Sequence, residues 1–572
     1  MNRRNFIGYG LAGGIASALP YSLSANSNIS SKTEVEALNA VETLKAKEMK
    51  ADVVIAGGSL GGCAAAIAAL RNGLKIIMTE ETDWLGGQLT SQGVPPDEHP
   101  WIETHGAPAS YRTFRTAVRD IYRRTYPLTE AAKERRYLNP GGGSVSVLCH
   151  EPRVALAALY DIFNPYISAG KMTLLLEYKA VAADVTGDKV QALKVRSLKS
   201  GNELILNAPY FIDATELGDL LHLTGTEYVT GAEAQKDTGE MHAAEHADPA
   251  NQQAFTVCFA VDNIPGANNI IDKPKSYNFW RNHIPALTPA WSGKLLDLTY
   301  SNPSTLEPKK LGFNPDGKSI DGGILNLWNY RRIIYKDNFL SGCYDSDICL
   351  VNWPQNDYAL GNLDGKDFAK HFIKGKELSL SLLYWLQTEC PRPDGGTGWS
   401  GLRLRGDIMG TDDGMAKYPY VREARRIKAL FTVLEEHVGK EQRIAVSGEA
   451  TAAKFYDSVG TGYYHIDLHP STKGNNYIDF PSLPFQLPLG AFIPQRMENL
   501  LPACKNIGTT HITNGCYRLH PVEWSIGEAV GCLTAYALKH QTTPRAVRET
   551  PPRLADFQTS IRSQGLEPEW PA

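Results

Sequence analysis

The sequence contains a cluster of glycines and one carboxylate with the types and spacing needed to hold a dinucleotide. The cluster is GGSLGG at residues 57–62, and Glu80 follows it at about the 20-residue spacing of a ribose-binding acid. Glycines allow a tight turn and a close approach to a phosphate, which the N–H groups of a following helix attract. Ser59 replaces the second glycine of G-x-G-x-x-G, but serine is small enough to leave room for a phosphate. We therefore predict dinucleotide binding here rather than a merely structural turn.

The segments around this cluster predict a βαβ unit. Residues 53–55 are a short apolar, β-branched run, which is typical of a strand buried on both faces. The Ala-rich segment CAAAIAALRNG favours a helix that ends at Gly73. The next strand, KIIMTE, ends at Glu80. This order places the glycine turn and the carboxylate at the same edge of a parallel sheet.

Further elements are expected on both sides of a compositionally different middle segment. Residues 110–124 predict an amphipathic helix, a second helix begins near Pro152, and the strand YFID leads into Ala214 and Thr215. Residues 230–460 are richer in Trp, Tyr, Asn and Pro, as a cleft for a polar organic ligand requires. Their helical patterns are KGKELSLSLLYWLQTE and REARRIKALFTVLEEHVG, and a final long helix begins near Pro521.

Composition and charge exclude several classes of protein. The 572 residues carry a formal net charge of −4, and no long basic stripe indicates nucleic-acid binding. The 14 histidines show no H-E-x-x-H or other metal spacing, so no metal site is expected. No apolar run after residue 25 reaches the roughly 20 residues of a membrane span. The expected partner is therefore a small molecule.

The first 25 residues have the features of a targeting segment. Arg3 and Arg4 precede a weakly apolar run that ends in small residues, as in a twin-arginine signal, although an ordinary N-terminal helix has a similar composition. Residues 26–50 are polar and are expected to form a linker. We therefore expect a periplasmic or secreted protein that folds around its cofactor before export.

The motifs resemble, in their order, those of the FAD-dependent oxidoreductase family of the glutathione-reductase type. They are GGSLGG with Glu80, WLGGQLTSQGV, HEPRV, IDATELGD, YVREARRI and NLLPACKNIGTTHITNGCYRLHPVEWSIGEAVG. The resemblance implies an α/β fold with a Rossmann-like FAD-binding domain and an inserted α+β substrate domain. The implied parts are 51–229 and 461–550 for the FAD-binding domain, 230–460 for the substrate or cap domain, and 551–572 for a tail.

The same resemblance assigns roles along the cofactor. Gly57, Ser59 and Gly62 would hold the pyrophosphate, Glu80 the adenosine ribose, and the helix from Pro521 would point at the flavin N1/C2 carbonyl. Gly87 and Gln88 would follow the ribityl–flavin side, Asp213 to Thr215 the ADP half, and Asn506 to Gly508 the pyrophosphate or ribityl. The implied cofactor-binding set is Gly57, Gly58, Ser59, Gly61, Gly62, Glu80, Gly87, Gln88, Val181, Ala214, Thr215, Asn506, Ile507, Gly508 and Glu523.

The chemistry expected is oxidation of an organic substrate by hydride transfer to the flavin. The sequence has no second dinucleotide fingerprint of the kind that an NAD(P)H-binding domain would carry. An exported protein also has little NAD(P)H available. Such oxidation needs a base, and histidine titrates in the useful range. The favoured candidate is His520, as base or hydrogen-bond donor, although it could instead cap the helix or contact the cofactor. The other catalytic candidates are His511, which is equally a cofactor or loop-fixing residue, and Arg422, which could instead form a structural ion pair. The candidate substrate contacts are Asn352, Tyr358, Arg403 and Tyr463.

The sequence leaves several functions open. The first is oxidation of a sugar or polyol alcohol, with oxygen, a quinone or a carrier protein as the electron acceptor. The second is an amine or amino-acid oxidase, and the third is a flavin reductase of unsaturated acids, which needs arginines and a proton donor. A flavin-bearing electron relay is the alternative from another class, but a relay does not need a large polar cleft.

Overall fold

The glycine cluster joins a strand to a helix in the computed structural model, which describes residues 47–571. Strand β2 (Val53–Ala56) is buried along its whole length, and helix α2 (Leu60–Arg71) begins directly after the turn. Ser59 is the N-cap of α2, and its Oγ accepts a hydrogen bond from the Gly62 N–H at 3.1 Å. The serine that departs from the glycine pattern therefore stabilises the start of the helix.

The predicted strands lie together in one five-stranded parallel sheet. Pairing of Ala56 with Thr79 on one side and with Asp213 on the other brings the carboxyl ends of three strands to one edge. Ligands of open α/β sheets bind at this edge. In spatial order the strands are β23 (Leu500–Pro502), β8 (Tyr210–Asp213), β2, β3 (Ile76–Glu80) and β4 (Met172–Leu176).

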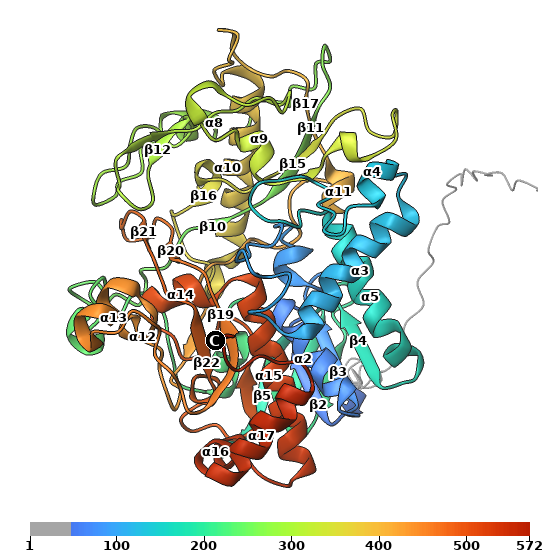
Figure 1. Cartoon of the computed structure of the whole chain (residues 1–572), viewed down its shortest axis with the longest axis vertical. Coiled ribbons are helices and arrows are strands. Elements are labelled where there is room, and N and C mark those ends of the chain that lie inside the picture. The colour runs from blue at the N-terminus through green and yellow to red at the C-terminus, as the bar shows by residue number, and fades with distance from the viewer. Residues whose placement is uncertain (1–46, 572) are drawn as a thin grey trace, which may run out of the picture. The chain divides into compact units, whose positions relative to one another are not determined.

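Helix α15 (His520–Lys539) brings the C-terminal segment back to the glycine cluster. Figure 1 shows α15, near the red end of the colour scale, beside the blue α2 and β2, and contacts between the two helices are extensive. A Cβ atom at Gly527 would lie 2.0 Å from the Gly61 carbonyl oxygen, and one at Gly531 would lie 2.4 Å from that of Ala65. Glycines four residues apart are therefore required for the two helices to pack closely.

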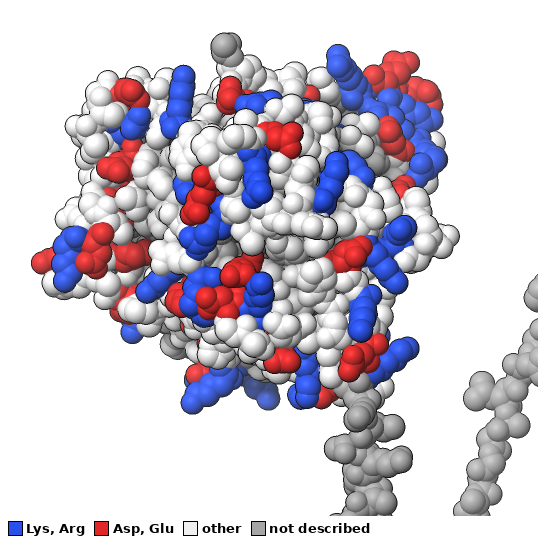
Figure 2. Space-filling model, turned by 90° about the horizontal axis from the view of Figure 1, so that it is seen from below, with Lys and Arg blue, Asp and Glu red and all other residues white. Residues whose placement is uncertain are grey.

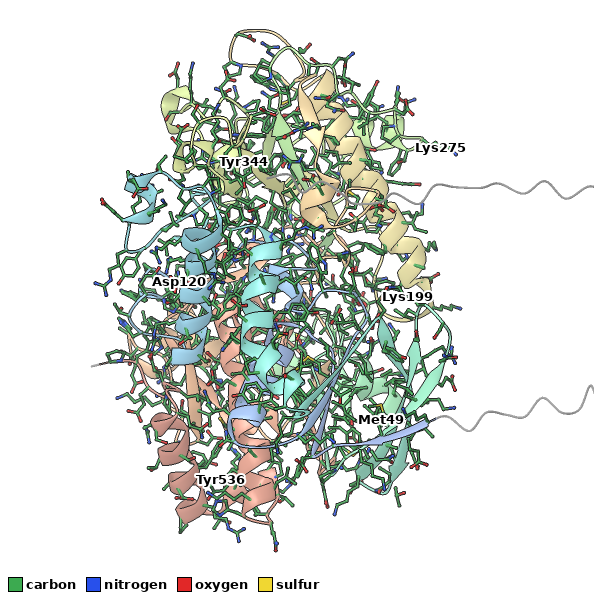
Figure 3. The ribbon with its side chains drawn as sticks, turned by 90° about the vertical axis from the view of Figure 1, so that its right-hand side faces the viewer. Met49, Asp120, Lys199, Lys275, Tyr344 and Tyr536 are labelled. Carbon is green, nitrogen blue, oxygen red and sulfur yellow. The ribbon has the colours of Figure 1, made fainter. Side chains whose placement is uncertain are left out.

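A second, mainly antiparallel sheet has a hydrophobic core of its own, rich in Trp and Tyr. Helix α10 (Phe368–Thr388) contributes Leu378, Leu382 and Trp385 to this core. Figure 3 shows Lys275 and Tyr344 of this region at the opposite end of the described chain from Tyr536 of α15. In spatial order the strands are β14 (Arg332–Ile334), β15 (Ile348–Val351), β11 (Phe259–Asn263) and β17 (Leu402–Leu404).

Smaller sheets complete the framework around these two. A four-stranded sheet has the order β1 (Lys47–Lys50), β7 (Glu203–Asn207), β6 (Lys189–Ser197) and β5 (Tyr178–Thr186). Two-stranded ladders join β10 (Phe255–Thr256) to β16 (Asp357–Tyr358), β12 (Thr299–Ser301) to β13 (Pro308–Lys310), β9 (Tyr228–Val229) to β18 (Arg426–Ile427), β19 (Ser458–Gly462) to β22 (Phe485–Pro488) and β20 (Ile466–Leu468) to β21 (Ile478–Phe480).

Besides α2 and α15, three further predicted helices are confirmed. They are α3 (Ala109–Thr125), whose apolar face is buried, α5 (Pro152–Ser168), which has a proline in its first turn, and α10. Shorter helices are α4 (Glu130–Lys133), α6 (Asp219–Thr224), α7 (Gln235–Thr238), α8 (Tyr277–Asn282), α9 (Leu327–Tyr330), α11 (Gly406–Met409), α12 (Glu435–Val438), α13 (Lys440–Ser447), α14 (His511–Tyr517), α16 (Pro544–Glu549) and α17 (Pro551–Ser563).

The helix expected over residues 422–439 is wrong. Most of this segment is irregular, with a short strand at Arg426–Ile427 and one helical turn at Glu435–Val438. Arg426 is buried and donates to the Gly231 and Thr509 carbonyl oxygens, while its backbone pairs with Val229. Bonds to distant segments therefore override the local helical preference of this sequence.

Figure 2 shows acidic and basic side chains interspersed over one face of the molecule, without a large patch of one sign. Within residues 47–571, no helix combines the length and apolar character needed to cross a bilayer. The described residues 47–571 form one compact unit, so the predicted boundaries at 230 and 460 stay predictions. The predicted twin-arginine signal and most of the predicted linker lie outside the described residues.

Candidate functional site

A narrow cleft opens at the carboxyl edge of the parallel sheet, where the sequence predicts a dinucleotide. It contains the glycine turn and the acidic end of β3, and it reaches β5 of the smaller sheet. The lining residues are Ala56, Gly57, Ser59, Thr79, Glu80, Glu81, Gly87, Ser91, Tyr178, Lys179, Ala180, Ala214, Thr215, Glu216 and Tyr418. Val181, the next residue along β5, is not among them.

Glu80 is held by the loops at this edge. Its Oε2 accepts from the Gly58 N–H at 2.9 Å, and its Oε1 accepts from the Thr82 N–H and hydroxyl, each at 2.8 Å. Burial raises the pKa of this carboxyl to about 7, although the bonds from Thr82 oppose the shift. The geometry fixes an acceptor at the position that the sequence assigns to a ribose.

The predicted contacts from the other strands also lie at this edge. Asp213 accepts from the Thr215 N–H at 3.0 Å and from its hydroxyl at 2.7 Å, so the chain turns past the cleft at Ala214. Asn506 donates from Nδ2 to the Asp213 carbonyl oxygen at 3.1 Å, which ties β23 to β8. Ile507 is buried, and a Cβ atom at Gly508 would lie 2.5 Å from that of Ala429, so these two residues pack the loop.

Buried polar atoms without protein partners follow the cleft inward. They are Gln88 Oε1, both side-chain polar atoms of Gln92, and Glu216 Oε1. Leaving such atoms unsatisfied costs free energy, so their grouping beside the glycine turn fits a polar ligand. Gln88 Nε2 donates to Glu523 Oε2 at 2.6 Å and to the Arg518 carbonyl oxygen at 3.1 Å. Gln88 therefore follows Gly87 of the cleft and bonds to Arg518, which lines a second cavity.

The second cavity has a volume of about 260 Å³ and lies among β12–β13, β20–β21 and the start of α15. Tyrosines and charged side chains from distant parts of the sequence line it. They are Asp97, Tyr300, Pro303, Lys309, Leu311, Leu325, Leu327, Tyr330, Arg331, Asn352, Trp353, Pro354, Tyr420, Arg422, Tyr464, His465, Asp467, His469, Tyr477, Asp479, Arg518 and Leu519.

Each arginine that faces this cavity has an aspartate partner. Arg331 pairs with Asp97 at 3.2 Å, and Arg518 pairs with Asp467 at 3.1 Å. Arg422, a predicted catalytic candidate, pairs with the buried Asp357 at 3.0 Å. The guanidinium charges are therefore balanced by fixed carboxylates, while the Nε atoms of all three arginines lack protein partners.

Two histidines reach the cavity from the sequence HIDLH. Residues 465, 467 and 469 alternate with the buried Ile466 and Leu468 of β20, so the polar side chains share one face. His469 Nδ1 lies 2.6 Å from Asp357 Oδ2, and its Nε2 lies 3.5 Å from Asp467 Oδ2. This period-two pattern was the signal in the sequence that could have identified these residues.

His465 forms a second histidine–aspartate pair, with its Nδ1 2.9 Å from Asp479 Oδ1. Burial alone would lower the pKa of His465, but the bond to Asp479 and the charge of Asp467 outweigh it and raise the pKa. His465 is therefore more readily protonated than a free histidine.

His520, the favoured catalytic candidate, lies at the start of α15 and is fully buried. Its Nδ1 accepts from the Asp97 N–H at 3.0 Å, and burial lowers its pKa to about 4. A neutral ring with an accepting Nδ1 carries its proton on Nε2, which has no protein partner. The geometry therefore fits a hydrogen-bond donor rather than a base.

Four predicted site residues lie away from the cavity. His511 pairs with Glu423 at 2.9 Å. This contact matches the loop-fixing role, which was the alternative to a catalytic one. Arg403 forms an ion pair with Asp262, and the Tyr358 hydroxyl contacts His371 Nδ1 at 3.1 Å. Tyr463 packs on Trp101, whereas its neighbour Tyr464 lines the cavity.

Residues 47–571 contain no cluster of His, Cys, Asp and Glu suited to a metal ion, and the absence of a metal site stays a prediction. Asn352, a predicted substrate contact, lines the cavity, and its Nδ2 lacks a protein partner.

Comparisons with known proteins identify the cofactor. The family model described as FAD dependent oxidoreductase matches residues 52–561, and the chain belongs to this family. FAD is therefore its cofactor, and the glycine turn, Glu80 and the unpartnered polar atoms of the cleft fit it. No curated protein matches the chain.

Solved structures show more distant likeness. L-proline dehydrogenase from P. horikoshii is 14% identical over 33% of this chain and 24% of its own, with a TM-score of 0.17. OxyS anhydrotetracycline hydroxylase from Streptomyces rimosus is 10% identical over 90% and 69%, with a TM-score of 0.32. Glycerol-3-phosphate dehydrogenase from Bacillus halodurans complexed with FAD is 12% identical over 37% and 40%, with a TM-score of 0.22. Scores this low carry no argument about substrate.

Proposed function

We propose that this FAD-dependent oxidoreductase oxidises an alcohol carbon of a neutral, polyhydroxylated substrate of the sugar or polyol class. The substrate binds in the cavity lined by Tyr330, Tyr420, Tyr464 and His469. Bound FAD supplies a two-electron acceptor for the hydride that leaves the substrate carbon. Oxygen, a quinone or a carrier protein then takes the electrons.

The observation that carries this proposal is the charge balance of the cavity. Arg331, Arg422 and Arg518 each already have an aspartate partner, so a carboxylate substrate would have to compete with fixed carboxylates. Several tyrosines and Asn352 instead offer neutral donors and acceptors, which suit hydroxyl groups. A neutral polar ligand satisfies these groups without adding an unbalanced charge.

His469 is the proposed base. Asp357 accepts from its Nδ1–H, which orients the ring and leaves Nε2 to take the proton of a substrate hydroxyl. The 3.5 Å separation of Nε2 from Asp467 is longer than a normal hydrogen bond, so a hydroxyl could replace this contact. Arg422 holds the other oxygen of Asp357 and keeps that carboxyl ionised and in place.

We also propose that the fold is of the glutathione-reductase type, with the substrate domain inserted between the two parts of the FAD-binding domain. The separate core around α10 and the return of α15 to α2 support it. A periplasmic or secreted location is also proposed, on the paired Arg3 and Arg4 of the sequence.

Anaerobic mixing of the holoprotein with sugars, polyols, amines and carboxylic acids tests the proposal. We expect a sugar or polyol to bleach the flavin absorbance, and His469→Asn to slow this bleaching about 10²–10⁴-fold while the FAD content stays unchanged. His465→Asn is the matched control, because its imidazole pairs with a different aspartate, and it should slow bleaching less. Bleaching by an amine instead, or an unchanged rate in His469→Asn, would contradict the proposal.

A flavin reductase of unsaturated acids is the second candidate, because three arginines face the cavity. It predicts no bleaching by any alcohol and reoxidation of the reduced protein by an unsaturated acid. The same anaerobic experiment separates the two candidates.

A further inference from the structure

A buried charge cluster lies behind the phosphate end of the nucleotide cleft. Lys505 follows strand β23, and its side chain is fully buried. Its ammonium group contacts Glu216 Oε2, lies 3.7 Å from Glu523 Oε2, and lies 3.3 Å from Cys504 Sγ. One fully buried cation therefore serves two carboxylates, of which Glu523 is fully buried and Glu216 is partly exposed.

Both carboxylates lie close to the start of α2. Glu523 Oε1 accepts from the Gly61 N–H at 3.1 Å. A Cβ atom at Gly87 would lie 2.6 Å from Glu216 Oε1 and 3.0 Å from Ser59 Cα. The N–H groups at this end of a helix are those that hold a pyrophosphate, so two acidic side chains flank the phosphate position.

The two acidic side chains would repel the phosphate groups of the cofactor. The pyrophosphate of FAD is an anion, and like charges repel strongly where the dielectric constant is low. Glu216 lines the cleft and has an unpartnered Oε1, whereas Lys505 lies behind it and does not line the cleft. The positive charge of Lys505 therefore acts on the phosphates through its acidic partners.

We propose that Lys505 is a positioning residue that offsets the charges of Glu216 and Glu523 and thereby allows the pyrophosphate of FAD to bind at the start of α2. Lys505 fixes the Glu216 carboxylate through Oε2, and Glu216 Oε1 remains an acceptor for a hydroxyl group of the cofactor. The proposal does not depend on which substrate enters the second cavity.

FAD titration of the stripped full-length protein, followed by flavin fluorescence, tests this proposal. Lys505→Met should raise the FAD dissociation constant about 10- to 100-fold, as expected for losing an interaction between charged groups. Glu216→Gln should lower it, because Lys505 then keeps more of its charge for the phosphates. The double variant should return to within about threefold of the wild type, because removing one cation and one carboxylate restores the net charge of the cluster, with Glu523 still present. A double variant as weak as Lys505→Met would overturn the proposal.

Competition with ADP and adenosine separates this role from a loss of structure. Lys505→Met should weaken ADP in proportion to FAD and leave adenosine unchanged, because adenosine has no phosphate. Equal weakening of both would show that the cleft itself has collapsed, and it would contradict the charge role. Lys417→Met is the matched control, since Lys417 is also mostly buried and pairs with Asp83 at 2.8 Å outside this cluster.

Discussion

The nucleotide cleft and the substrate cavity are built in different ways. In the cleft, backbone turns, a helix start and Glu80 come from one stretch of about 25 residues, with support from β8 and β23. In the cavity, side chains from residues 97–519 meet, and each arginine is matched with an aspartate. The cleft therefore depends on backbone geometry, whereas the cavity depends on pairings between distant side chains.

The largest effect is expected from disturbing the backbone of the cleft. Gly57 has φ +97°, and a Cβ atom there would lie 2.2 Å from the Ala214 carbonyl oxygen. Gly57→Ala should therefore abolish FAD retention, measured as flavin absorbance per chain. Gly73→Ala is the control: Gly73 has φ +86° but open space around it, so only backbone strain of about 1 kcal/mol is expected. Normal FAD content in Gly57→Ala would show that the cleft tolerates a shifted turn.

The next effect concerns His520, which lies between the two regions. Its folded pKa of about 4 is below the ordinary 6.5, so the unfolded chain binds more protons as the pH falls from 6.5 towards 4. Its contribution to the free energy of unfolding is present above pH 6.5, and about 3 kcal/mol is lost across that window. His520→Asn, whose Oδ1 can accept from Asp97, should flatten this loss in urea unfolding at pH 4.5 and 7.5.

The buried His150 keeps part of the acid sensitivity in that variant, because burial lowers its pKa to about 4 as well. An identical pH profile in wild type and His520→Asn would show that folding does not lower the pKa of His520.

A smaller effect should distinguish two neighbouring tyrosines of the cavity wall. Tyr464 lines the cavity, whereas Tyr463 packs against Trp101. Tyr464→Phe should raise KM for the substrate about tenfold by removing one hydrogen bond, while Tyr463→Phe should leave KM unchanged. The steady-state rates of the two variants check this difference, and the reverse order would mean that the substrate enters from the Trp101 side.

The smallest effect is expected outside both regions. Arg403 is about half-exposed and pairs with the buried Asp262, which Arg405 also contacts and continues to hold. Arg403→Gln should change neither KM nor FAD content, and it should shift the free energy of unfolding by no more than about 0.5 kcal/mol. A large rise in KM would return Arg403 to the substrate site and would weaken the contrast between cavity and surface.

The spacing of apolar residues and glycines correctly predicted the helices and strands whose contacts lie within one short segment. The buried strand 53–55, the glycine turn and the acid-ended strand form one βαβ unit, and the predicted helices at Ala109, Pro152 and Phe368 are present. The helix expected at 422–439 failed because Arg426 is bonded to distant carbonyl groups. The helical spacing of residues in a sequence does not reveal hydrogen-bond partners that lie in distant segments.

The cavity residues were harder to predict, since each pair joins segments far apart in the sequence. Arg331 meets Asp97, and His469 meets Asp357, across stretches that no local pattern links. His511 and His520 were chosen because they lie in the C-terminal segment expected to border the flavin, yet only His520 contacts a residue of the cavity wall.

By itself, the sequence determined the cofactor class, because the glycine turn, helix start and ribose acid lie within one short segment whose geometry follows from local chemistry. Only the tertiary structure decided which side chains share the cavity, how Asp357 orients His469, and that Lys505 lies behind Glu216. The physical reason is that buried charges need partners, and the fold brings those partners from elements that are distant along the chain.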